Sequence, residues 1–551
     1  MSTIRRELVY AAIHKSSSLI DYNIHDNNDK RFEFVNQSIL ADNSLTDNEK
    51  TEAIKILNID HDRNKVRNNE GTRRICENCN QECLATLYCE FCVRNYLKLN
   101  FVNWTSGNDN IDNLIQKCQM ETYVPYKIIE WIPYDNLKDI KYLTKGGFSE
   151  IYTATWIDGR CDEWDSKEQR LIRFGSMKVV LKSLENVESA NQSWLEEAKS
   201  HLTISNIHED VVGCFGLTQN PSNRNYMLVI LKMDIDLRKY LQQNHNLLTW
   251  KKRISILYKI TISLYWIHRE NAIHRDLHSG NILYSQFNDS WFISDLGFCG
   301  PADKSLKSIY GNLPYIAPEV IIGKDYTFKS DIYSIAILMW EISSGQLPFI
   351  NYKYDDYDLA MDIINGMRPE IVSEIPLEYK KLMEQCWDAD PSRRPDIQIV
   401  LEKMSEIHLL YQNEPDELTH QSSVNVNSND LEMNKTNINY KSSRLFTTKV
   451  YQFENFPEPR NATKEEQKAF YSKSYNFTIP YNVDDFDSQI SKDNSKSELS
   501  KEFIKLQIND IDYNEEKIMP QRIIIDDGDE MYNDPNLHSE EQDELEIPDD
   551  L

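Results

Sequence analysis

A lysine and a glutamate near the middle of the chain have the types and spacing that phosphate chemistry requires. Lys182 ends the apolar, strand-like run 177–182, and Glu197 lies in the helix-like segment 194–199. A lysine that leaves a buried strand usually extends its amine to water. Here the strand would instead direct the amine to the α- and β-phosphates of a nucleotide, and an acid is needed to orient it. The pair therefore predicts a phosphate-binding site.

A turn with small residues precedes this lysine. The stretch 143–152 has Gly146, Gly147 and Ser149 at its tip. Small residues let backbone N–H groups come close to phosphate oxygens, because little Cβ bulk stands between them. A simple Gly-Gly turn between two strands explains the same letters. Taken alone, this motif does not decide between the two.

Four more motifs follow in order and strengthen the phosphoryl-transfer interpretation. Each of them is short, and each alone is a weak match. Their common order and intervals are very hard to obtain by chance. They are Ile273–Leu283 with its His-Arg-Asp-Leu-His-Ser-Gly-Asn core, Ile293–Gly297 with Ser-Asp-Leu-Gly, Tyr315–Glu319, and Lys329–Asp331. Arg394, much further along the chain, belongs to the last of these motifs.

With these motifs in place, residues 137–408 resemble a eukaryotic protein kinase domain. Details near the C-terminal end of this stretch resemble the tyrosine-kinase-like group: Met339–Phe349, Gly366–Pro369 and Cys386–Asp388. Over roughly residues 46–408 the chain is also similar to the expanded kinase family of arbuscular mycorrhizal fungi. The stretches that carry this likeness are Cys76–Gln119, Lys145–Ser149 and His274–Asn281.

The resemblance implies a role for each matching residue, with ATP and Mg²⁺ as cofactors. Lys182 would hold the α- and β-phosphates and pair with Glu197, and Asp276 would accept the proton of the substrate hydroxyl. Asn281 and Asp295 would hold Mg²⁺, which prefers oxygen ligands. Glu319 with Arg394, and Asp331, would be structural. The expected ATP-binding residues are Leu143, Gly146, Gly147, Ser149, Ile151, Val180, Lys182, Ile230, Leu231, Met233 and Leu283, with Ile230 as gatekeeper and the hinge near 231–233.

Several positions depart from the family pattern. Thr144 and Ser149 replace two of three glycines, Val180 replaces an alanine, and Leu296 replaces a phenylalanine. His278 replaces the lysine common in Ser/Thr kinases, and its charge would vary near pH 6.5. Asn312 replaces a threonine that touches that position in the family fold. The resemblance favours Ser/Thr over Tyr as acceptor, while the pair His278 and Asn312 leaves hydroxyl selectivity open.

Five of the ten cysteines lie between residues 76 and 92. Two Cys-x₂-Cys pairs, with Cys83 between them, can place four thiolates around a structural Zn²⁺. Cys76, Cys79, Cys89 and Cys92 are the expected ligands, although the fifth cysteine leaves the ligand set ambiguous. A reduced hairpin without metal is the alternative. Cys299 is a weaker candidate for a redox-sensitive thiol.

These residues need a scaffold that brings distant segments together. The expected fold is α+β: a bilobal kinase fold with a small β-rich N-lobe and a larger helical C-lobe over residues 137–408. A polar region with one helix (1–70) and a Cys-rich module (71–125) would precede it, and a mostly disordered acidic tail (413–551) would follow. Thr46 and Glu49 form the expected capping box of the N-terminal helix.

Charge limits the partners. The 551 residues carry a formal net charge of −27. This charge disfavours nucleic acid and anionic membranes as partners, and no apolar run is long enough to span a bilayer. A soluble, cytoplasmic protein with protein substrates is expected. The last stretch, Lys501–Leu551, has 17 acidic and 4 basic side chains, and residues 526–550 are predicted to contact the kinase domain as a pseudo-substrate.

Two further hypotheses concern regulation and activity. Arg275 precedes Asp276 and would pair with a phosphate on the activation segment, for which Ser305, Ser308 and Tyr310 are the candidate acceptors. The alternative to an active enzyme is a pseudokinase: a zinc-knuckle adaptor whose kinase fold holds partners without catalysis. The complete set of Lys, Glu, Asp, Asn and Asp favours the enzyme.

Overall fold

The structure is a computed structural model of the whole chain. It describes residues 4–473 except for the gaps 22–23, 123, 146–148, 185–192, 287–288, 299, 302–308, 351, 353–354, 373 and 413–447. Gly146, Gly147, Cys299, Ser305, Ser308 and the acidic stretch 501–551 therefore lie outside the described residues. No helix in the described part is both long enough and apolar enough to cross a bilayer.

Three helices, not one, form the N-terminal region: α1 (Arg6–Ser18), α2 (Asn28–Ala41) and α3 (Asp47–Asn68). The capping box is confirmed, since Glu49 accepts a hydrogen bond from the Thr46 backbone N–H at 2.9 Å and donates its own N–H to Thr46 Oγ1. Val9, Ile39 and Ala53, one from each helix, are fully buried against one another. Shared burial stabilises all three helices, which explains why polar sequences with little periodicity are still helical.

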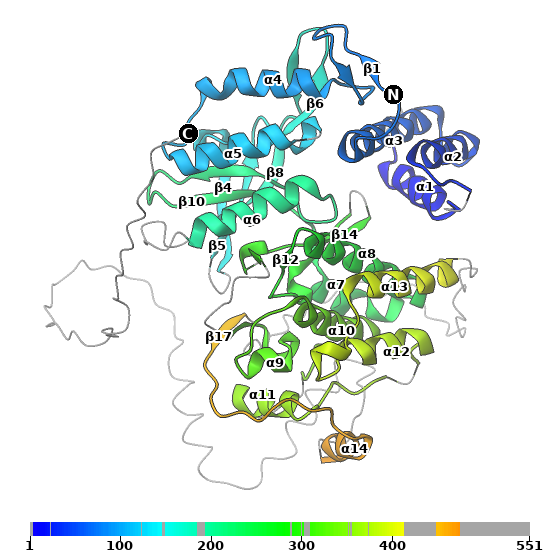
Figure 1. Cartoon of the computed structure of the whole chain (residues 1–551), viewed down its shortest axis with the longest axis vertical. Coiled ribbons are helices and arrows are strands. Elements are labelled where there is room, and N and C mark those ends of the chain that lie inside the picture. Colours follow the sequence, from blue (N-terminus) through cyan, green and yellow to red (C-terminus); the bar gives the residue numbers. More distant parts are fainter. Residues whose placement is uncertain are drawn as a thin grey trace, which may run out of the picture. The chain divides into compact units, whose positions relative to one another are not determined.

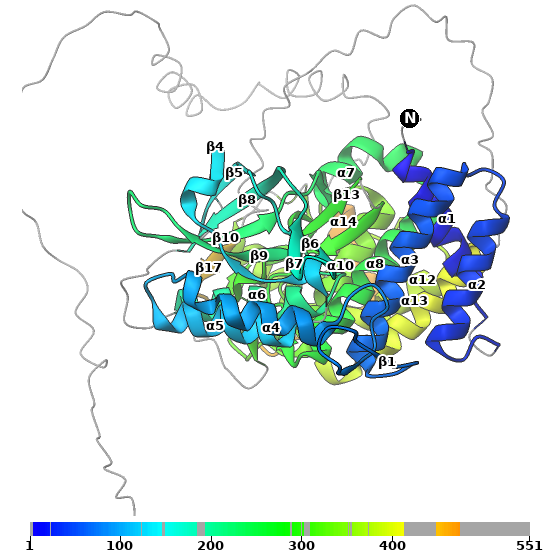
Figure 2. The ribbon, with the colours of Figure 1, turned by 90° about the horizontal axis from the view of Figure 1, so that it is seen from above.

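The Cys-rich segment forms a hairpin and two helices. The elements are β1 (Arg74–Ile75), β2 (Glu82–Cys83), α4 (Glu90–Asn100) and α5 (Asp109–Glu121). Asp62 of α3 accepts hydrogen bonds from the backbone N–H groups of Thr86 and Leu87, both at 2.7 Å. These bonds attach the loop before α4 to the N-terminal helices. Helices α4 and α5 run side by side in both views (Figures 1 and 2).

A six-stranded sheet forms the N-lobe, with strand order β3-β9-β10-β8-β5-β4. Helix α6 (Ser193–Ile207) packs on one face together with α5, so the Cys-rich segment contributes to the N-lobe core. The hairpin of β6 (Cys161–Asp165) and β7 (Arg170–Arg173) packs on the cysteine module. The sheet strands are β3 (Glu130–Trp131), β4 (Leu137–Lys145), β5 (Glu150–Trp156), β8 (Met177–Ser183), β9 (Cys214–Gln219) and β10 (Tyr226–Leu231).

The C-lobe is mostly helical, which confirms the expected bilobal fold. Helix α10 lies at its centre: every side chain from Ser330 to Ser344 is buried. The helices are α7 (Leu237–Asn244), α8 (Trp250–Arg269), α9 (Pro318–Ile321), α10 (Phe328–Ser344), α11 (Asp356–Ile364), α12 (Leu377–Cys386) and α13 (Ile397–Gln412). The short strands are β11 (Ile235–Asp236), β12 (Ala272–Ile273), β13 (Ile282–Ser285), β14 (Ser290–Ile293), β15 (Gly300–Pro301) and β16 (Ile309–Gly311).

Residues 448–473 differ from the expectation of a mostly disordered tail. They contain β17 (Lys449–Tyr451) and α14 (Lys464–Lys473), and β17 pairs antiparallel with β16. Tyr451 is buried in the C-lobe core. Figure 1 shows this orange segment passing α9 and α11 on its way to α14. We call residues 448–473 the C-terminal strap. Its aromatic side chains pack on one another and on the C-lobe core, so local composition alone does not reveal its order.

Candidate functional site

Three charged side chains, two from the N-lobe and one from the C-lobe, meet in one cluster. The Lys182 amine at the end of β8 lies 2.8 Å from Glu197 Oε1 of α6 and forms a second ion pair with Asp295, which follows β14. The pairing of β8 with β5 and β10 directs Lys182 toward α6. The predicted lysine–glutamate pair is therefore present in the structure, with Asp295 as a second partner of the amine.

Burial and charge oppose each other in this cluster. Burial disfavours the charged form of Lys182, but Asp295 and Glu197 outweigh it and raise the pKa of the lysine. Burial likewise disfavours an ionised Asp295, but Lys182 outweighs it and lowers the pKa of that carboxyl. Both groups are therefore charged at neutral pH. Such a fixed cation beside a fixed anion suits the binding of phosphate together with a divalent cation.

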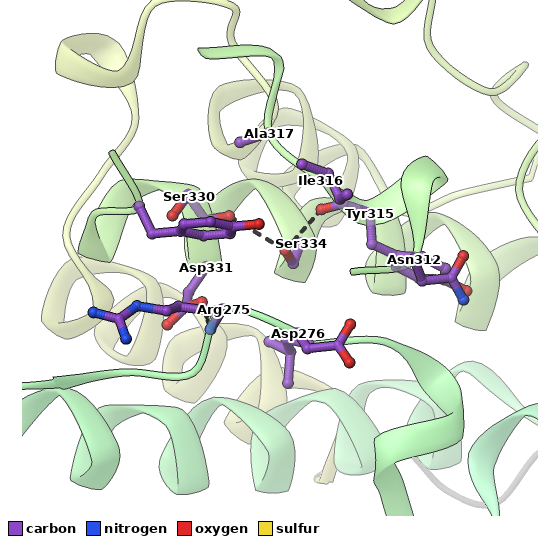
Figure 3. A pocket seen from close by; sticks show the side chains of 11 residues that line it. Arg275, Asp276, Asn312, Tyr315, Ile316, Ala317, Ser330, Asp331 and Ser334 are labelled. Carbon is purple, nitrogen blue, oxygen red and sulfur yellow. Dashed lines mark hydrogen bonds between the residues drawn. The ribbon is translucent and has the colours of Figure 1, made fainter. Parts of the chain in front are cut away.

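The loop that carries Asp276 is braced from α10. Asp331 Oδ2 accepts the backbone N–H of His274 at 2.8 Å, and Asp331 Oδ1 accepts that of Arg275 at 2.9 Å. His268 Nε2 lies 2.9 Å from the same carboxylate. Arg275 has φ = 69°, a strained value for a non-glycine residue, and these bonds hold it there. Figure 3 shows Asp331 and Arg275 close together, with Asp276 on the adjoining stretch of the loop.

Asn281 connects the Asp276 loop to Asp295. Its side-chain Nδ2 donates to the backbone oxygen of Asp276 at 2.9 Å. Its backbone oxygen accepts from Ser294, the residue before Asp295, at 2.8 Å from N and 2.9 Å from Oγ. The amide nitrogen is thus occupied, and the carboxamide oxygen is the atom of this side chain that a cation would contact. A carboxamide oxygen and an ionised carboxylate are a donor set that fits Mg²⁺.

Asp276 is buried, and burial raises its pKa to about 7. A carboxylate with that pKa can accept a proton near neutral pH and release it again. Its Oδ2 accepts a hydrogen bond at 2.8 Å from the hydroxyl of Thr448 in the strap. Its Oδ1 lies 3.7 Å from His278 Nε2. The proposed proton acceptor is therefore already in contact with a hydroxyl group of the chain.

His278 is neutral, which corrects the expectation that its charge varies near pH 6.5. Burial lowers its pKa well below the ordinary value, and the nearby Arg238 adds to this shift. His278 Nδ1 accepts the backbone N–H of Gly280 at 3.0 Å. The ring proton is therefore assigned to Nε2, the nitrogen that faces Asp276. His278 can donate one hydrogen bond there but supplies no positive charge.

Asn312, the other departure from the family pattern, is almost fully buried. In the part of the chain that the structure describes, neither its Oδ1 nor its Nδ2 has a hydrogen-bond partner. It lines the small pocket beside Asp276 (Figure 3). The expected contact with His278 is thus not a hydrogen bond.

The predicted adenine-binding residues lie on or beside strands β5, β8 and β10 of the N-lobe and β13 of the C-lobe. Ile151, Val180 and Leu283 are half-buried, as are Ile230, Leu231 and Met233. The backbone N–H of Leu231 donates to the Gly213 oxygen at 2.9 Å, so it is not available to a ligand. Ser149 is buried, whereas Leu143 is 57% exposed.

The structural residues predicted in the C-lobe are in place. Arg394 makes two hydrogen bonds of 2.7 Å to the two carboxylate oxygens of Glu319, and both side chains are buried. Tyr310 is 3% exposed, so its hydroxyl is a poor target for modification in this conformation. Of the three candidate acceptors on the activation segment, only Tyr310 falls within the described residues.

The cysteine cluster has the geometry of a four-thiolate site. Cys76 Sγ lies 3.7 Å from Cys92 Sγ, and Cys79 Sγ lies 3.6 Å from Cys89 Sγ. All four sulfur atoms lie within 4.8 Å of one another, and Cys83 is not among them. Zn–S bonds of about 2.3 Å place the sulfurs of a tetrahedral site about 3.8 Å apart. The donor set and its spacing therefore fit Zn²⁺.

Thr448 was not among the residues predicted from the sequence. It lies in a polar stretch far from every motif, and no local signal marks it. The nearest clue is the pair of aromatic residues at 453 and 456 that follows it. Aromatic residues in a polar tail often pack against a surface of the folded domain or of a partner.

Comparisons with known proteins agree with this geometry. A family model described as "Protein tyrosine and serine/threonine kinase" matches residues 137–404. The dual specificity protein kinase zakA of Dictyostelium discoideum is 31% identical over 211 residues, which is 35% of this chain and 27% of that protein. The dual specificity protein kinase zak2 of the same organism is 33% identical over 198 residues, or 32% of this chain and 30% of that protein.

A plant relative matches over a longer stretch. The serine/threonine-protein kinase STY17 of Arabidopsis thaliana is 25% identical over 285 residues, which is 50% of this chain and 46% of that protein. The chain spans less than half the length of each of these three relatives. The family match, the two lobes and the assembled motif residues together identify residues 137–404 as a eukaryotic protein kinase domain.

Proposed function

We propose that this chain is an ATP- and Mg²⁺-dependent protein kinase that acts in intracellular signalling. The observation that carries this proposal is the ion-paired cluster of Lys182, Glu197 and Asp295, together with the hydrogen bond from Asn281 to the Asp276 backbone. The alternative is a pseudokinase that holds partners without catalysis. It is disfavoured because none of these five positions is substituted.

Each residue has a definite task in this proposal. Lys182, held by Glu197, would bind phosphate oxygens and orient the nucleotide. Mg²⁺, when bound by Asn281 and Asp295, neutralises charge on the phosphate oxygens. Asp276 would accept the proton of the attacking hydroxyl, and its pKa of about 7 matches this work. His278 would donate a hydrogen bond from Nε2 without adding charge.

The acceptor is proposed to be serine or threonine in preference to tyrosine. The relatives are named serine/threonine or dual specificity kinases, which supports this choice. A short hydroxyl also fits beside Asp276, because the Thr448 hydroxyl lies 2.8 Å from its carboxylate. Phosphoamino-acid analysis of the labelled product separates the three hydroxyl types.

The cysteine cluster is proposed to hold a structural Zn²⁺ on Cys76, Cys79, Cys89 and Cys92. The first pair lies on the β1–β2 hairpin, and the second lies at the start of α4. Burial raises the pKa of the Cys89 and Cys92 thiols, so a bound dication is what would hold them as thiolates. Four thiolates leave no open position for a substrate, so the metal would be structural.

Transfer of labelled γ-phosphate tests the main proposal. Wild type and Asp276→Asn are incubated with Mg²⁺, labelled ATP and myelin basic protein. We expect wild type to label the substrate and the variant to lose about 10²–10⁴-fold of the rate, as is typical for loss of a general base. Equal, background-level signals from both proteins would favour the adaptor.

A further inference from the structure

The C-terminal strap places a threonine hydroxyl at the catalytic carboxylate. Thr448 Oγ1 donates to Asp276 Oδ2 at 2.8 Å and lies 3.4 Å from His278 Nε2. These two side chains are the ones that the proposed mechanism assigns to the acceptor hydroxyl. Thr448 therefore occupies the position of an acceptor residue rather than merely lying nearby.

Strand pairing sets the register of Thr448. Strand β17 pairs with β16 of the activation segment, with Tyr451 opposite Ile309 and Lys449 opposite Gly311. A Cβ atom on Gly311 would lie 3.4 Å from Asp276 Oδ1. The residue before Lys449 is thus brought beside Asp276. A one-residue slip of β17 would turn its side chains to the opposite face and remove Tyr451 from the core.

Side chains just after Thr448 hold that register. Lys449 Nζ lies 3.1 Å from Asp356 Oδ2 at the start of α11, and both side chains are about one-third exposed. Tyr451 is 7% exposed and stacks on Phe453 at a ring-centroid distance of 5.3 Å. Phe456 packs against Tyr357 at 4.9 Å. One buried and two half-buried aromatic rings anchor this extended segment.

The far half of the strap is also fitted to the C-lobe. The backbone N–H of Arg460 donates to the Ile364 oxygen at 3.0 Å. Asn461 accepts from the Ala389 N–H and donates to Asp388, both at 2.9 Å. Gly366 has φ = 91°, and a Cβ there would come within 2.1 Å of the Ala462 nitrogen. The glycine at position 366 therefore leaves room for the strap, and any larger side chain there would clash with the strap backbone.

From this arrangement we propose that Thr448 is an intramolecular phosphorylation site, which the domain modifies in cis. The proposal rests on the proposed kinase function. In the reaction, the bond between the γ-phosphorus and the β,γ-bridging oxygen of the nucleoside triphosphate breaks. A bond forms between that phosphorus and Thr448 Oγ1, the hydroxyl proton goes to Asp276, and nucleoside diphosphate leaves.

The chemistry of the Thr448 side chain fits a phosphate acceptor better than a segment that only blocks the site. A blocking segment needs no hydroxyl, whereas Thr448 presents an O–H group to Asp276. Tethering holds the acceptor in place, so transfer does not depend on encounter between two molecules. The phosphorylated product would add two negative charges beside Asp276, and this repulsion would weaken the hold of the strap. Modification would therefore open the acceptor position to other substrates.

The test uses the full chain, dephosphorylated with a phosphatase that is then removed. Mg²⁺ and ATP are added, and phosphate on Thr448 is followed by mass spectrometry. Myelin basic protein in a parallel sample reports transfer to an external acceptor. We expect Thr448 to be labelled with a rate constant that stays constant over an about 100-fold range of protein concentration, as an intramolecular step requires. Asp276→Asn should abolish both signals.

Matched variants test the Thr448 hydroxyl and the Lys449–Asp356 ion pair that helps to hold it in place. Thr448→Ser keeps the hydroxyl and should still be phosphorylated in cis. Lys449→Asp places two carboxylates together at Asp356 and should slow labelling of Thr448 about fivefold or more, because one half-buried ion pair becomes a repulsion. The charge-swapped double variant Lys449→Asp/Asp356→Lys should restore the rate. Thermal unfolding of each variant shows whether the domain is intact.

Three results would overturn the proposal. Phosphate on myelin basic protein with none on Thr448 would reject the cis site while leaving the kinase function standing. A labelling rate that rises in proportion to protein concentration would show transfer between molecules. Absence of both signals from folded wild type would reject the kinase function and the cis site together.

Discussion

The catalytic cluster and the cysteine cluster differ in how their residues are brought together. Cys76, Cys79, Cys89 and Cys92 fall within 17 consecutive residues, and one hairpin and one helix start are enough to gather them. Lys182 and Asp295 are 113 residues apart and meet only through the packing of both lobes. The cysteine cluster therefore needs little more than local structure, whereas the catalytic cluster forms only when both lobes are folded and packed together.

The two clusters also differ in what holds their charges. Lys182 and Asp295 balance each other, so each stays ionised in a buried place. The four thiols of the cysteine cluster lie within 4.8 Å of one another. Four thiolates in one place repel one another, and a dication removes that repulsion. Changes in the catalytic cluster should therefore affect rate, and changes in the cysteine cluster should affect stability.

The largest effect is expected from the lysine of the catalytic cluster. Lys182→Met removes the cation and leaves Glu197 and Asp295 facing each other, so phosphoryl transfer should fall about 10²–10³-fold. Glu197→Gln, the matched variant, keeps the amine and should lose less. Initial rates with labelled ATP measure both. A Lys182→Met enzyme with the wild-type rate would remove this residue from the mechanism.

The cysteine cluster should respond in stability instead. Structural zinc contributes about 10–16 kcal/mol of binding, and one ligand in four is about 3 kcal/mol of that. Cys76→Ser should lose zinc and lower the free energy of unfolding by roughly that amount, as shown by metal analysis and thermal unfolding. Cys83→Ala is the control and should keep one zinc per chain. Untreated wild type with as little zinc as Cys76→Ser, near zero in both, would contradict the site.

The rate of phosphoryl transfer should also depend on pH, because the proton acceptor of the catalytic site titrates near neutrality. Because burial raises the pKa of Asp276 to about 7, the proton acceptor is half protonated at that pH. The rate should rise with pH between 6 and 8, and at pH 6 it should be about one-tenth of its plateau. Steady-state rates at saturating Mg²⁺ and ATP give the profile, with circular dichroism as the control for folding. A flat profile would mean that Asp276 titrates at its ordinary value.

The smallest effect is expected at His278. This histidine is neutral and offers one hydrogen bond from Nε2, a contribution of about 1 kcal/mol or about fivefold in rate. His278→Gln keeps a neutral donor and should stay within that range, while His278→Ala should reach it. Both rates are measured with the same labelled substrate. A loss above about 100-fold in His278→Gln would assign the ring a larger task than hydrogen bonding.

Much of the fold was predictable from the chain. The two lobes follow from the strand-like runs before residue 231 and the amphipathic helices after it. The capping box at Thr46 was readable because it depends on residues only three apart. Helices α1 and α2 were not, since they are stabilised by a core shared among three helices.

The same distinction holds within the site. Motif order identified Lys182, Asp276 and Asp295, because family chemistry leaves few residue types for each task. Burial decided that His278 is neutral, and the number of neighbours that bury a side chain cannot be read from a motif. Thr448 reaches Asp276 across 172 positions of the chain. No sequence motif connects two residues that are so far apart in the chain.

The sequence by itself determined the class of chemistry: a lysine, two aspartates, an asparagine and a glutamate in one order, and two pairs of cysteines at ligand spacing. Only the tertiary structure decided which four of the five cysteines bring their sulfurs together, which nitrogen of His278 carries the proton, and which hydroxyl meets the catalytic carboxylate. The reason is physical. Residue types and short spacings set what a group can do, whereas distance, burial and neighbouring charge arise only when distant segments pack together.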